Sequence, residues 1–296
     1  MKLTISLVLT LLSSVAFAGT LTVKSGSSIQ AVINQAKDGD TVLVEPGYYH
    51  ESIYVDKQNI TLQGMVKDGK YAHLDGQTKL NDGIIASGHG IVIDSFKVTG
   101  YKGNAIMTQG ANNFKITNNL VHAAFYGIFP QYGKNGLVKG NTISGADDAA
   151  IYVGMCDHIN VIANTTFDNV MGLEFENTRH SLMADNLVYN NTTGIMLSLI
   201  PGLPVKDANN IVLRNNVIRD NNLKNFAPAS SIAATVPQGV GIIVEAVDDV
   251  VIKDNVIEGN KSVGIFVTDM YTFGLSGDSK VEPYSDNVQV RENTFK

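Results

Sequence analysis

The segments "FKITNN" (114–119) and "GLVKGN" (136–141) decide the fold, because each is a short β-rich run that ends on an asparagine, and the two asparagines lie 22 residues apart. The same pattern recurs in "INVIAN" (159–164), "SLMADN" (181–186), "IVLRNN" (211–216), "VVIKDN" (250–255) and "VQVREN" (288–293). We expect Ser95 to take the asparagine position one turn before Asn119. A repeat of this length predicts a solenoid.

A second β-rich segment follows each asparagine after about eight to ten residues, as in "YGIF" (126–129), "MGLEF" (171–175) and "VGIIV" (240–244). Apolar residues alternate within these segments, and none shows a sustained helical period. Two or three short strands per turn are typical of a parallel β-helix. The sequence therefore predicts an all-β fold, a single-stranded right-handed parallel β-helix.

The repeated asparagines are explained by structure alone. Stacked coils lie about 4.8 Å apart, so an asparagine in each turn can bond the asparagines above and below. Asparagine also tolerates the left-handed backbone that tight turns need. We therefore expect an internal ladder and place none of these residues in a functional site.

The two ends of the repeat differ. Ile29, Val32, Ile33 and Ala36 fall on one helical face, and Ser27 or Ser28 can cap the helix start. We expect this helix within an N-terminal cap at about 25–65, with coils at about 66–296. At the other end, 288–296 stops partway through a coil, so we expect it to cover the stack loosely or to pair with another chain. The protein would be a monomer or associate end to end.

Residues 1–18 resemble a secretory signal peptide: Lys2, an apolar run, and Ala16-Phe17-Ala18 as the cleavage site. We expect a mature domain at 19–296 in the periplasm or the medium, with no membrane span, because no segment reaches the roughly 20 apolar residues that one needs. The 28 acidic residues outnumber the 22 basic ones, which argues against nucleic acid. The single cysteine, Cys156, excludes an intramolecular disulfide.

The segments "SIQAVINQAKDGDTVLVEPGYYHESI" (28–53), "TGIMLSLIPGLPV" (193–205) and "NNLKNFAP" (221–228) resemble a bacterial family of right-handed parallel β-helix repeat proteins with the pectin-lyase-like fold. The resemblance covers nearly all of the mature chain and implies the fold and export. It implies no activity, because members of the family are mostly of unknown role. Where relatives tend to have Gly-Gln-Ser, this chain has Gly154-Met155-Cys156.

Departures from the repeat indicate where a site lies. The asparagine spacing grows to 30, 39 and 38 residues, which predicts loops at about 198–209, 221–239 and 269–286. The first two flank the same strand column, so we expect a groove on its outer face, walled by the "PGLPV" and "NFAP" loops.

Alternation names the floor of this groove. If Ile151 and Leu173 point inward, then Tyr152, Glu174 and Glu176 point outward. We predict catalytic roles for Tyr152, Glu174 and Glu176, and binding roles for the set Phe129, Glu245, Arg179 and Asp148. Such a groove suits a polysaccharide or oligosaccharide, and its carboxylates suit Ca²⁺. The simpler alternatives are a solvated acidic strand face for Glu174 and Glu176, and packing beneath loops for Phe129 and Tyr152.

His158 and His180 should stack on adjacent coils, with Asp157 and Arg179 paired alongside. Two imidazoles can begin a copper or zinc site, but the sequence shows no third ligand, and structural stacking at the corner is the favoured explanation of the pair. The identity of any metal is therefore unknown.

The aspartates of "GADDAAI" (145–151) resemble those of polygalacturonases, and "SGHG" (87–90) resembles their histidine motif. The two motifs occur in the wrong order, so we do not expect pectin hydrolysis. The Asp-Pro-His element expected of alginate epimerases is also absent from the sequence.

Three functions remain open. One is a carbohydrate-active enzyme of lyase or epimerase type, in which Tyr152 is the base and a cation neutralises the substrate. Another is a non-catalytic periplasmic accessory or binding protein, such as a metalloenzyme maturation or cytochrome-partner factor. The third is a structural adhesion role, which the loops argue against. Whether the chain is an enzyme stays open at this stage.

Overall fold

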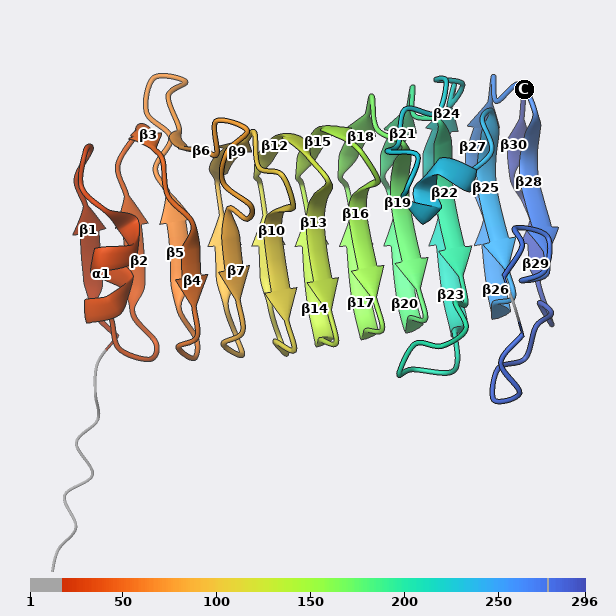
Figure 1. The fold of residues 1–296 in the computed structure, drawn as a ribbon, viewed down its shortest axis with the longest axis horizontal. Helices are drawn as coiled ribbons and strands as arrows, with labels where there is room; N and C mark the ends of the chain where they lie inside the picture. Colours follow the sequence, from red (N-terminus) through yellow and green to blue (C-terminus); the bar gives the residue numbers. More distant parts are fainter. Residues whose placement is uncertain (1–17, 276) are drawn as a thin grey trace, which may run out of the picture.

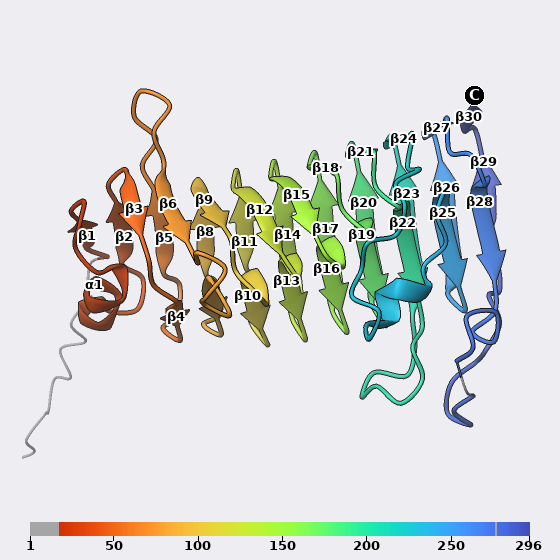
Figure 2. The same ribbon diagram turned by 45° about the horizontal axis from the view of Figure 1, so that its top comes forward.

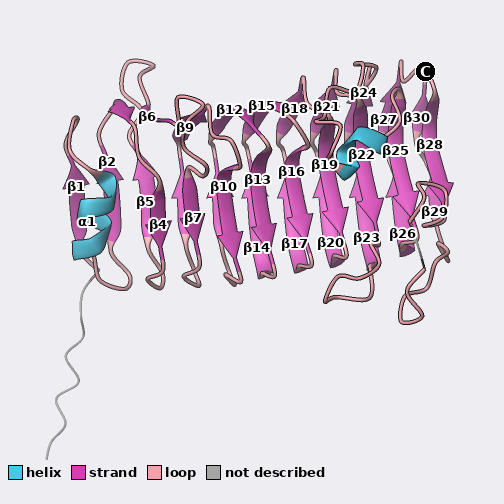
Figure 3. Cartoon of the chain, viewed as in Figure 1, coloured by secondary structure: helices cyan, strands magenta, loops and turns pink. Residues whose placement is uncertain are grey.

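The computed structural model describes residues 18–275 and 277–296. The predicted signal peptide falls outside these residues, apart from Ala18. The chain winds into an elongated all-β parallel β-helix with three long sheets and little helix (Figures 1 and 3). Every pair of neighbouring strands in the three sheets is parallel, as the repeat predicted.

The first sheet has 11 strands, each contributed by one coil. They are β1 (Thr20–Val23), β2 (Thr41–Val44), β5 (Thr61–Gly64), β8 (Val92–Asp94), β11 (Lys115–Thr117), β14 (Lys134–Lys139), β17 (Asp157–Ile162), β20 (Arg179–Ala184), β23 (Asn209–Arg214), β26 (Asp248–Lys253) and β29 (Gln289–Arg291). Regular strands thus begin at Thr20, so the region 25–65 already contains coils and only its helix acts as a cap.

The second sheet has nine strands and carries the predicted groove. They are β4 (Ile53–Val55), β7 (Ile84–Ala86), β10 (Asn104–Gln109), β13 (Tyr126–Gln131), β16 (Ala149–Gly154), β19 (Met171–Glu176), β22 (Thr193–Ser198), β25 (Val240–Glu245) and β28 (Val263–Thr268). Its strands lie side by side along the whole molecule (Figure 2).

The third sheet has ten strands and completes the coil. They are β3 (Gly47–Tyr49), β6 (Ala72–Asp75), β9 (Phe96–Thr99), β12 (Leu120–Ala124), β15 (Thr142–Ala146), β18 (Thr165–Phe167), β21 (Leu187–Tyr189), β24 (Val217–Arg219), β27 (Val256–Glu258) and β30 (Thr294–Phe295). Inward-facing aliphatic side chains of the three sheets form one continuous core.

The predicted capping helix is α1 (Ile29–Gln35). The Ser28 hydroxyl accepts a hydrogen bond from the Ala31 amide at 3.2 Å, which satisfies one free donor of the first turn. Ile29 and Ile33 are buried against the first coils, where α1 lies at the N-terminal end of the stack (Figure 1).

The predicted asparagine ladder is present. Asn141, for example, donates from its side chain to Asn164 Oδ1 at 3.0 Å and to the Ile116 carbonyl at 2.9 Å, and it is 1 % exposed. One predicted position was wrong. Phe96, and not Ser95, takes the ladder position one turn before Asn119, because the Phe96 amide donates to Asn119 Oδ1. Ser95 sits one residue earlier, at a left-handed corner with φ 62°, where its hydroxyl contacts Asp94.

A second ladder was not predicted. It consists of Asn169, Asn191, Asn221 and Asn260, each five residues after a member of the first ladder. Asn169 donates to Asn191 Oδ1 at 2.9 Å, and Asn191 donates to Asn221 Oδ1 at 2.9 Å. This ladder fixes the corners that lead into β19, β22, β25 and β28.

The C-terminal residues form further strands. β29 pairs with β26 and β30 pairs with β27, so 289–295 continues two of the sheets instead of covering the stack loosely. Val290 and Phe295 are 45 % and 56 % exposed there. Association with another chain stays a prediction. Among the described residues, no helix has the length and apolar character to cross a membrane.

Candidate functional site

Three loops interrupt the regular coils, close to the predicted positions. They span 199–208, 220–239 and 269–288, after β22, β24 and β28. The second contains a short 3-10 helix, η1 (Ile232–Thr235), which lies in front of the second sheet near β22 (Figures 1 and 2). Lys206 of the first loop pairs with Asp278 of the third at 2.7 Å, so these two loops are tied together.

The register of the second sheet agrees with the predicted alternation. Tyr152, Glu174 and Met196 occupy one outward column, followed by Ile243 and Phe266. The next outward column contains Glu176, Ser198 and Glu245. Inward residues such as Ile151 and Leu173 belong to the central core.

The carboxylates of this face are buried. Glu174 is 7 % exposed and Glu245 is 0 % exposed, so the alternative of a solvated acidic strand face was wrong. The reason is the second loop: Ala233 and Val236 pack with Tyr152, Met196 and Ile243 in a second apolar cluster outside the coil.

Beneath the second loop lies a cavity of about 300 Å³, which we call the acidic cavity. Its lining includes the carboxyl groups of Asp148, Glu174, Glu176 and Glu245, and the ring of Tyr152. Other walls are apolar or aromatic, including Tyr126, Met196, Val236 and Phe273. The cavity is thus at the small end of ligand-binding pockets.

The loop segments that line the acidic cavity differ from those predicted. Ile200, 231–233 and 235–237 line it, together with Phe273 and Leu275 of the third loop, whereas "PGLPV" (201–205) and "NFAP" (225–228) do not. The "NFAP" segment instead supports one wall. The Asn225 amide donates to the Ala233 carbonyl at 2.8 Å and to the Val236 carbonyl at 2.9 Å, and so holds η1 in place.

The acidic cavity changes the ionisation of its carboxyl groups. Burial raises the pKa of Asp148 to about 7, with the charge of Glu176 adding to the shift and the Tyr126 hydroxyl opposing it. Burial raises the pKa of Glu245 to about 8, aided by Asp269 and Glu176. Neither carboxylate oxygen of Glu245 has a hydrogen-bond partner in the described part of the chain. Near neutral pH, Glu245 therefore largely keeps its proton, whereas Asp148 is protonated in only part of the molecules.

Glu174 and Glu176 are shifted in the same direction. Burial raises the pKa of Glu174 well above its usual value, and the charges of Asp148, Glu176 and Glu245 add to this effect. Burial also raises the pKa of Glu176, while the hydrogen bond from Tyr152 opposes the shift.

Tyr152 is not suited to the predicted role of base. Its hydroxyl donates a hydrogen bond to Glu176, and burial and the nearby charges of Glu176 and Glu174 raise its pKa above the ordinary value. A phenol in this setting stays protonated and acts as a donor.

Two predicted binding residues lie outside the acidic cavity. Phe129 stacks on Tyr152 with ring centroids 4.3 Å apart, so it supports the cavity from below without lining it. Arg179 lies on β20 of the first sheet, where it pairs with Asp207 at 3.1 Å and lies 3.9 Å from Asp157. It was misplaced because strand alternation identifies a face of the coil only within one sheet.

The corner histidines lie where the sequence predicted. The rings of His158 and His180 stack with centroids 4.9 Å apart, and Asp157 pairs with Arg179 beside them. The structure also identifies a third possible metal ligand, Asp157, which was not predicted as one from the sequence. Asp157 Oδ1 lies 2.9 Å from His158 Nδ1 and 2.8 Å from His180 Nδ1. The sequence feature that could have identified Asp157 as a ligand is its position directly before His158.

Three solved structures have similar folds and low sequence identity to this chain. The A-module of mannuronan C-5 epimerase AlgE6 from Azotobacter vinelandii is 15 % identical, with a TM-score of 0.62 over 94 % of this chain and 76 % of that one. The catalytic domain of a GH87 α-1,3-glucanase in complex with tetrasaccharides is 12 % identical, with a TM-score of 0.59 over 93 % and 58 %. Pectate lyase Pel9A is 13 % identical, with a TM-score of 0.51 over 96 % and 79 %. These likenesses show the fold.

Comparison with curated proteins by sequence finds no match. A family model does match, in two overlapping segments, residues 33–200 and 84–296, and its description is "Periplasmic copper-binding protein (NosD)". The segments together cover nearly all of the described chain, including every strand of the acidic cavity and both corner histidines. This chain is therefore a right-handed parallel β-helix protein that belongs to the NosD family.

Proposed function

We propose that this protein is exported and binds a neutral saccharide in the acidic cavity, where its carboxyl groups can act on a glycosidic bond. The observation that carries the proposal is the convergence of four carboxyl groups and Tyr152 on one partly enclosed cavity with apolar and aromatic walls. The signal-like segment 1–18 and the periplasmic description of the family support export.

The walls suit a sugar. A protonated carboxyl group both donates and accepts hydrogen bonds, and hydroxyl groups need partners of both kinds. Tyr126 and Phe273 offer apolar ring surface for the less polar face of a sugar ring. The fold neighbours add support, since their titles name an epimerase of mannuronan, a pectate lyase and a glucanase that holds tetrasaccharides.

The charge of the acidic cavity favours a neutral ligand. No lysine, arginine or histidine of the described residues lines it, so a uronate would meet no basic side chain there. A lyase or epimerase reaction on a uronate would need a cation such as Ca²⁺ to offset the charge of the carboxylates. The raised pKa values of Asp148 and Glu245 instead reduce the negative charge of the cavity near pH 7.

The same ionisation pattern suits acid–base chemistry. Cleavage of a glycosidic bond uses one protonated carboxyl group to protonate the leaving oxygen and one carboxylate on the other side. Asp148 and Glu245 are the protonated candidates. Glu176 is the best candidate for the carboxylate, because the Tyr152 hydroxyl donates to it. A non-catalytic accessory role would not require this combination of protonated and ionised carboxyl groups in one cavity.

Calorimetry with neutral and uronate oligosaccharides, with and without Ca²⁺, tests the proposal, alongside assays for new reducing ends and for unsaturated uronates. We expect a neutral oligosaccharide to bind the wild-type protein without Ca²⁺. Binding should be lost in the variant that combines Glu174→Gln with Glu176→Gln, and kept in the control Glu258→Gln on β27.

Each other result contradicts one part of the proposal. Undiminished saccharide binding in the double variant would show that Glu174 and Glu176 do not form the binding site. Binding of uronates alone, with a requirement for Ca²⁺, would overturn the neutral ligand class. Failure of every saccharide to bind would overturn the function.

A further inference from the structure

The corner between the second and first sheets repeats one backbone geometry on successive coils. The corner residue has a left-handed φ each time, at Asn113, Asn135, His158, His180, Asn210, Asp249 and Asn287. Asparagine and aspartate are the usual residues for this conformation, because their short side chains bond to nearby backbone. The turn therefore does not require histidine, yet two adjacent coils carry it.

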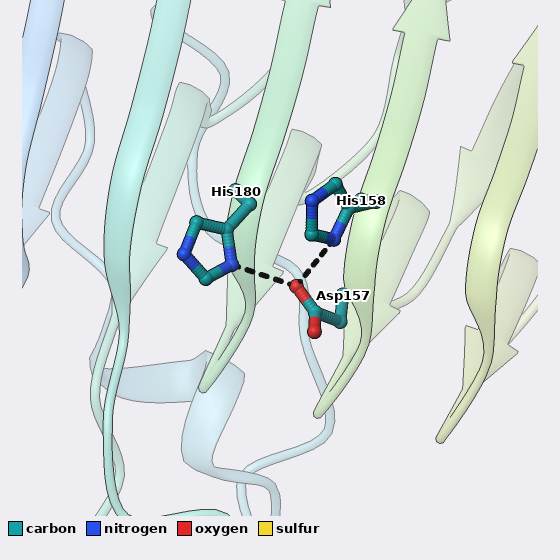
Figure 4. A group of neighbouring side chains, drawn as sticks. All are labelled: Asp157, His158 and His180. Carbon is teal, nitrogen blue, oxygen red and sulfur yellow. Dashed lines mark hydrogen bonds and ion pairs between the residues drawn. The ribbon is translucent and has the colours of Figure 1, made fainter.

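The two histidines share one carboxylate oxygen. Figure 4 shows both rings turned toward Asp157, with Oδ1 2.9 Å from His158 Nδ1 and 2.8 Å from His180 Nδ1. In the described part of the chain, this is the one group of three His, Cys, Asp or Glu side chains whose ligand atoms all lie within 4.8 Å of one another. The carboxyl groups of the acidic cavity form no such group.

The surroundings hold Asp157 while leaving the imidazoles accessible. Arg179 lies 3.9 Å from Asp157 Oδ2 and pairs with Asp207, so it restrains the oxygen that faces away from the rings. The side chains of His158 and His180 are 60 % and 44 % exposed. A restrained outer neighbour of this kind orients ligands in metal sites, and the open side leaves room for further ligands.

We infer that Asp157, His158 and His180 form a binding site for a divalent transition-metal ion of the Cu²⁺ type, on the first sheet and separate from the acidic cavity. Imidazole with carboxylate is a donor set that Cu²⁺ accepts. The family description names copper but no ligands. The inference does not depend on the proposed saccharide function.

The donor set favours Cu²⁺ among the transition metals. Asp157 Oδ1 lies 2.8–2.9 Å from both imidazole nitrogens, which is the distance of hydrogen-bonded or ion-paired groups, and a metal ion would take the place of the proton between them. Sites with nitrogen and oxygen ligands in square or tetragonal positions are typical of Cu²⁺ and Ni²⁺.

The test uses the mature chain without a histidine tag, titrated with Cu²⁺, Zn²⁺ and Ca²⁺ by calorimetry and, for Cu²⁺, by electron paramagnetic resonance. We expect one Cu²⁺ per chain, a tetragonal spectrum with nitrogen couplings, and a Cu²⁺-dependent rise in melting temperature, because a ligand of the folded state stabilises it.

His158→Asn and His180→Asn are matched variants, because asparagine occupies this corner on neighbouring coils and preserves the left-handed turn. Each should weaken Cu²⁺ binding on the order of 10-fold or more and remove nitrogen coupling, while the melting temperature without metal stays near that of the wild type. His122→Asn, which alters a histidine that contacts Ser144 elsewhere, should bind Cu²⁺ as the wild type does.

Unchanged Cu²⁺ affinity in both corner variants, or no saturable binding by the wild type, would overturn the inference and leave Asp157 as an ion-pair partner of the histidines. Tighter binding of Zn²⁺ than of Cu²⁺ would overturn the choice of Cu²⁺ as the metal.

Discussion

The early and late strands of the second sheet share one scaffold but differ in what covers them. In β4, Tyr54 faces outward and is 51 % exposed, whereas in β16 the outward Tyr152 is 8 % exposed. The inward residues next to them, Val55 and Ile151, are equally buried. The core therefore does not distinguish the two regions, and the difference arises outside the coil.

Loops and asparagines create that difference together. The second loop leaves the coil at Asn221, a member of the second ladder, and returns where the Gly239 amide donates to the Thr192 carbonyl at 2.9 Å. Earlier coils have Ala146 at the ladder position, as shown by its amide donating to Asn169 Oδ1. The comparison indicates that a polar interior ladder rigidifies the coils that must carry a loop.

Removal of the second loop should have the largest effect. Replacing 222–238 by a short glycine-containing turn would make the late coils resemble the early ones and expose Met196 and Ile243. We expect loss of saccharide binding, a lower melting temperature and new binding of a hydrophobic dye, because an apolar face would meet water. Shortening the 65–71 turn is the control and should change none of these. Retained saccharide binding after deletion would show that the loop is not a wall of the site.

Breaking the second ladder should have the next largest effect. Asn191→Ala removes the acceptor of two buried donors on Asn169, its backbone amide at 3.0 Å and its side-chain nitrogen at 2.9 Å. The side-chain nitrogen keeps the Phe167 and Ile143 carbonyls as acceptors, but the backbone amide is left without a partner. A buried donor without a partner is costly, so we expect a loss of roughly 2 kcal/mol in the free energy of unfolding. Asn34→Ala on the exposed face of α1 serves as the control. Equal denaturation midpoints for the two variants would refute a structural role for the ladder.

Glu245→Gln should have an effect that depends on pH. The folded protein holds the proton of Glu245 with a pKa of about 8, above the usual value of 4.5, so the wild type loses stability as the pH rises through that range. The amide does not ionise and avoids this loss. We expect similar melting temperatures near pH 4.5 and a melting temperature several degrees higher for the variant near pH 8. Glu258→Gln should show no such trend, and a pH-independent difference for Glu245→Gln would contradict its raised pKa.

The smallest effect concerns the two tyrosines. Tyr54→Phe removes a hydroxyl that lies 3.1 Å from Ser87 Oγ at an exposed site, so the stability should change by less than about 0.5 kcal/mol. Tyr152→Phe removes the buried donor to Glu176 and should cost about 1 kcal/mol or more. Paired melting curves measure both. Equal losses of stability in the two variants would mean that burial by the second loop does not strengthen the hydrogen bond of Tyr152 relative to that of Tyr54.

The repeat made most of the fold predictable. Asn119 to Asn293 set the coil spacing, and the alternation in "MGLEF" placed Leu173 inside and Glu174 outside. The second ladder was equally visible in the sequence, since Asn169, Asn191 and Asn221 follow the same spacings as the first ladder. Ser95 was misassigned because its left-handed corner resembles the neighbouring ladder position.

The site was less predictable than the fold. Alternation found the outward column, but it could not tell how far η1 would cover Glu174 and Glu245, since burial by a loop depends on contacts distant in sequence. The contribution of Phe273 from the third loop was missed for the same reason. Asp157 was overlooked as a donor because a shared oxygen between adjacent coils is a property of stacking distance, which spacing alone does not give.

The single cysteine gives the molecule a built-in reporter of local opening. Cys156 is fully buried in the turn between β16, which lines the acidic cavity, and β17, which carries His158. A thiol reagent can reach it only when the surrounding coils separate, so its labelling rate at low reagent reactivity measures how often that happens. Labelling with and without each ligand would therefore reveal whether the sugar and the metal clamp the same coils, without any engineered probe.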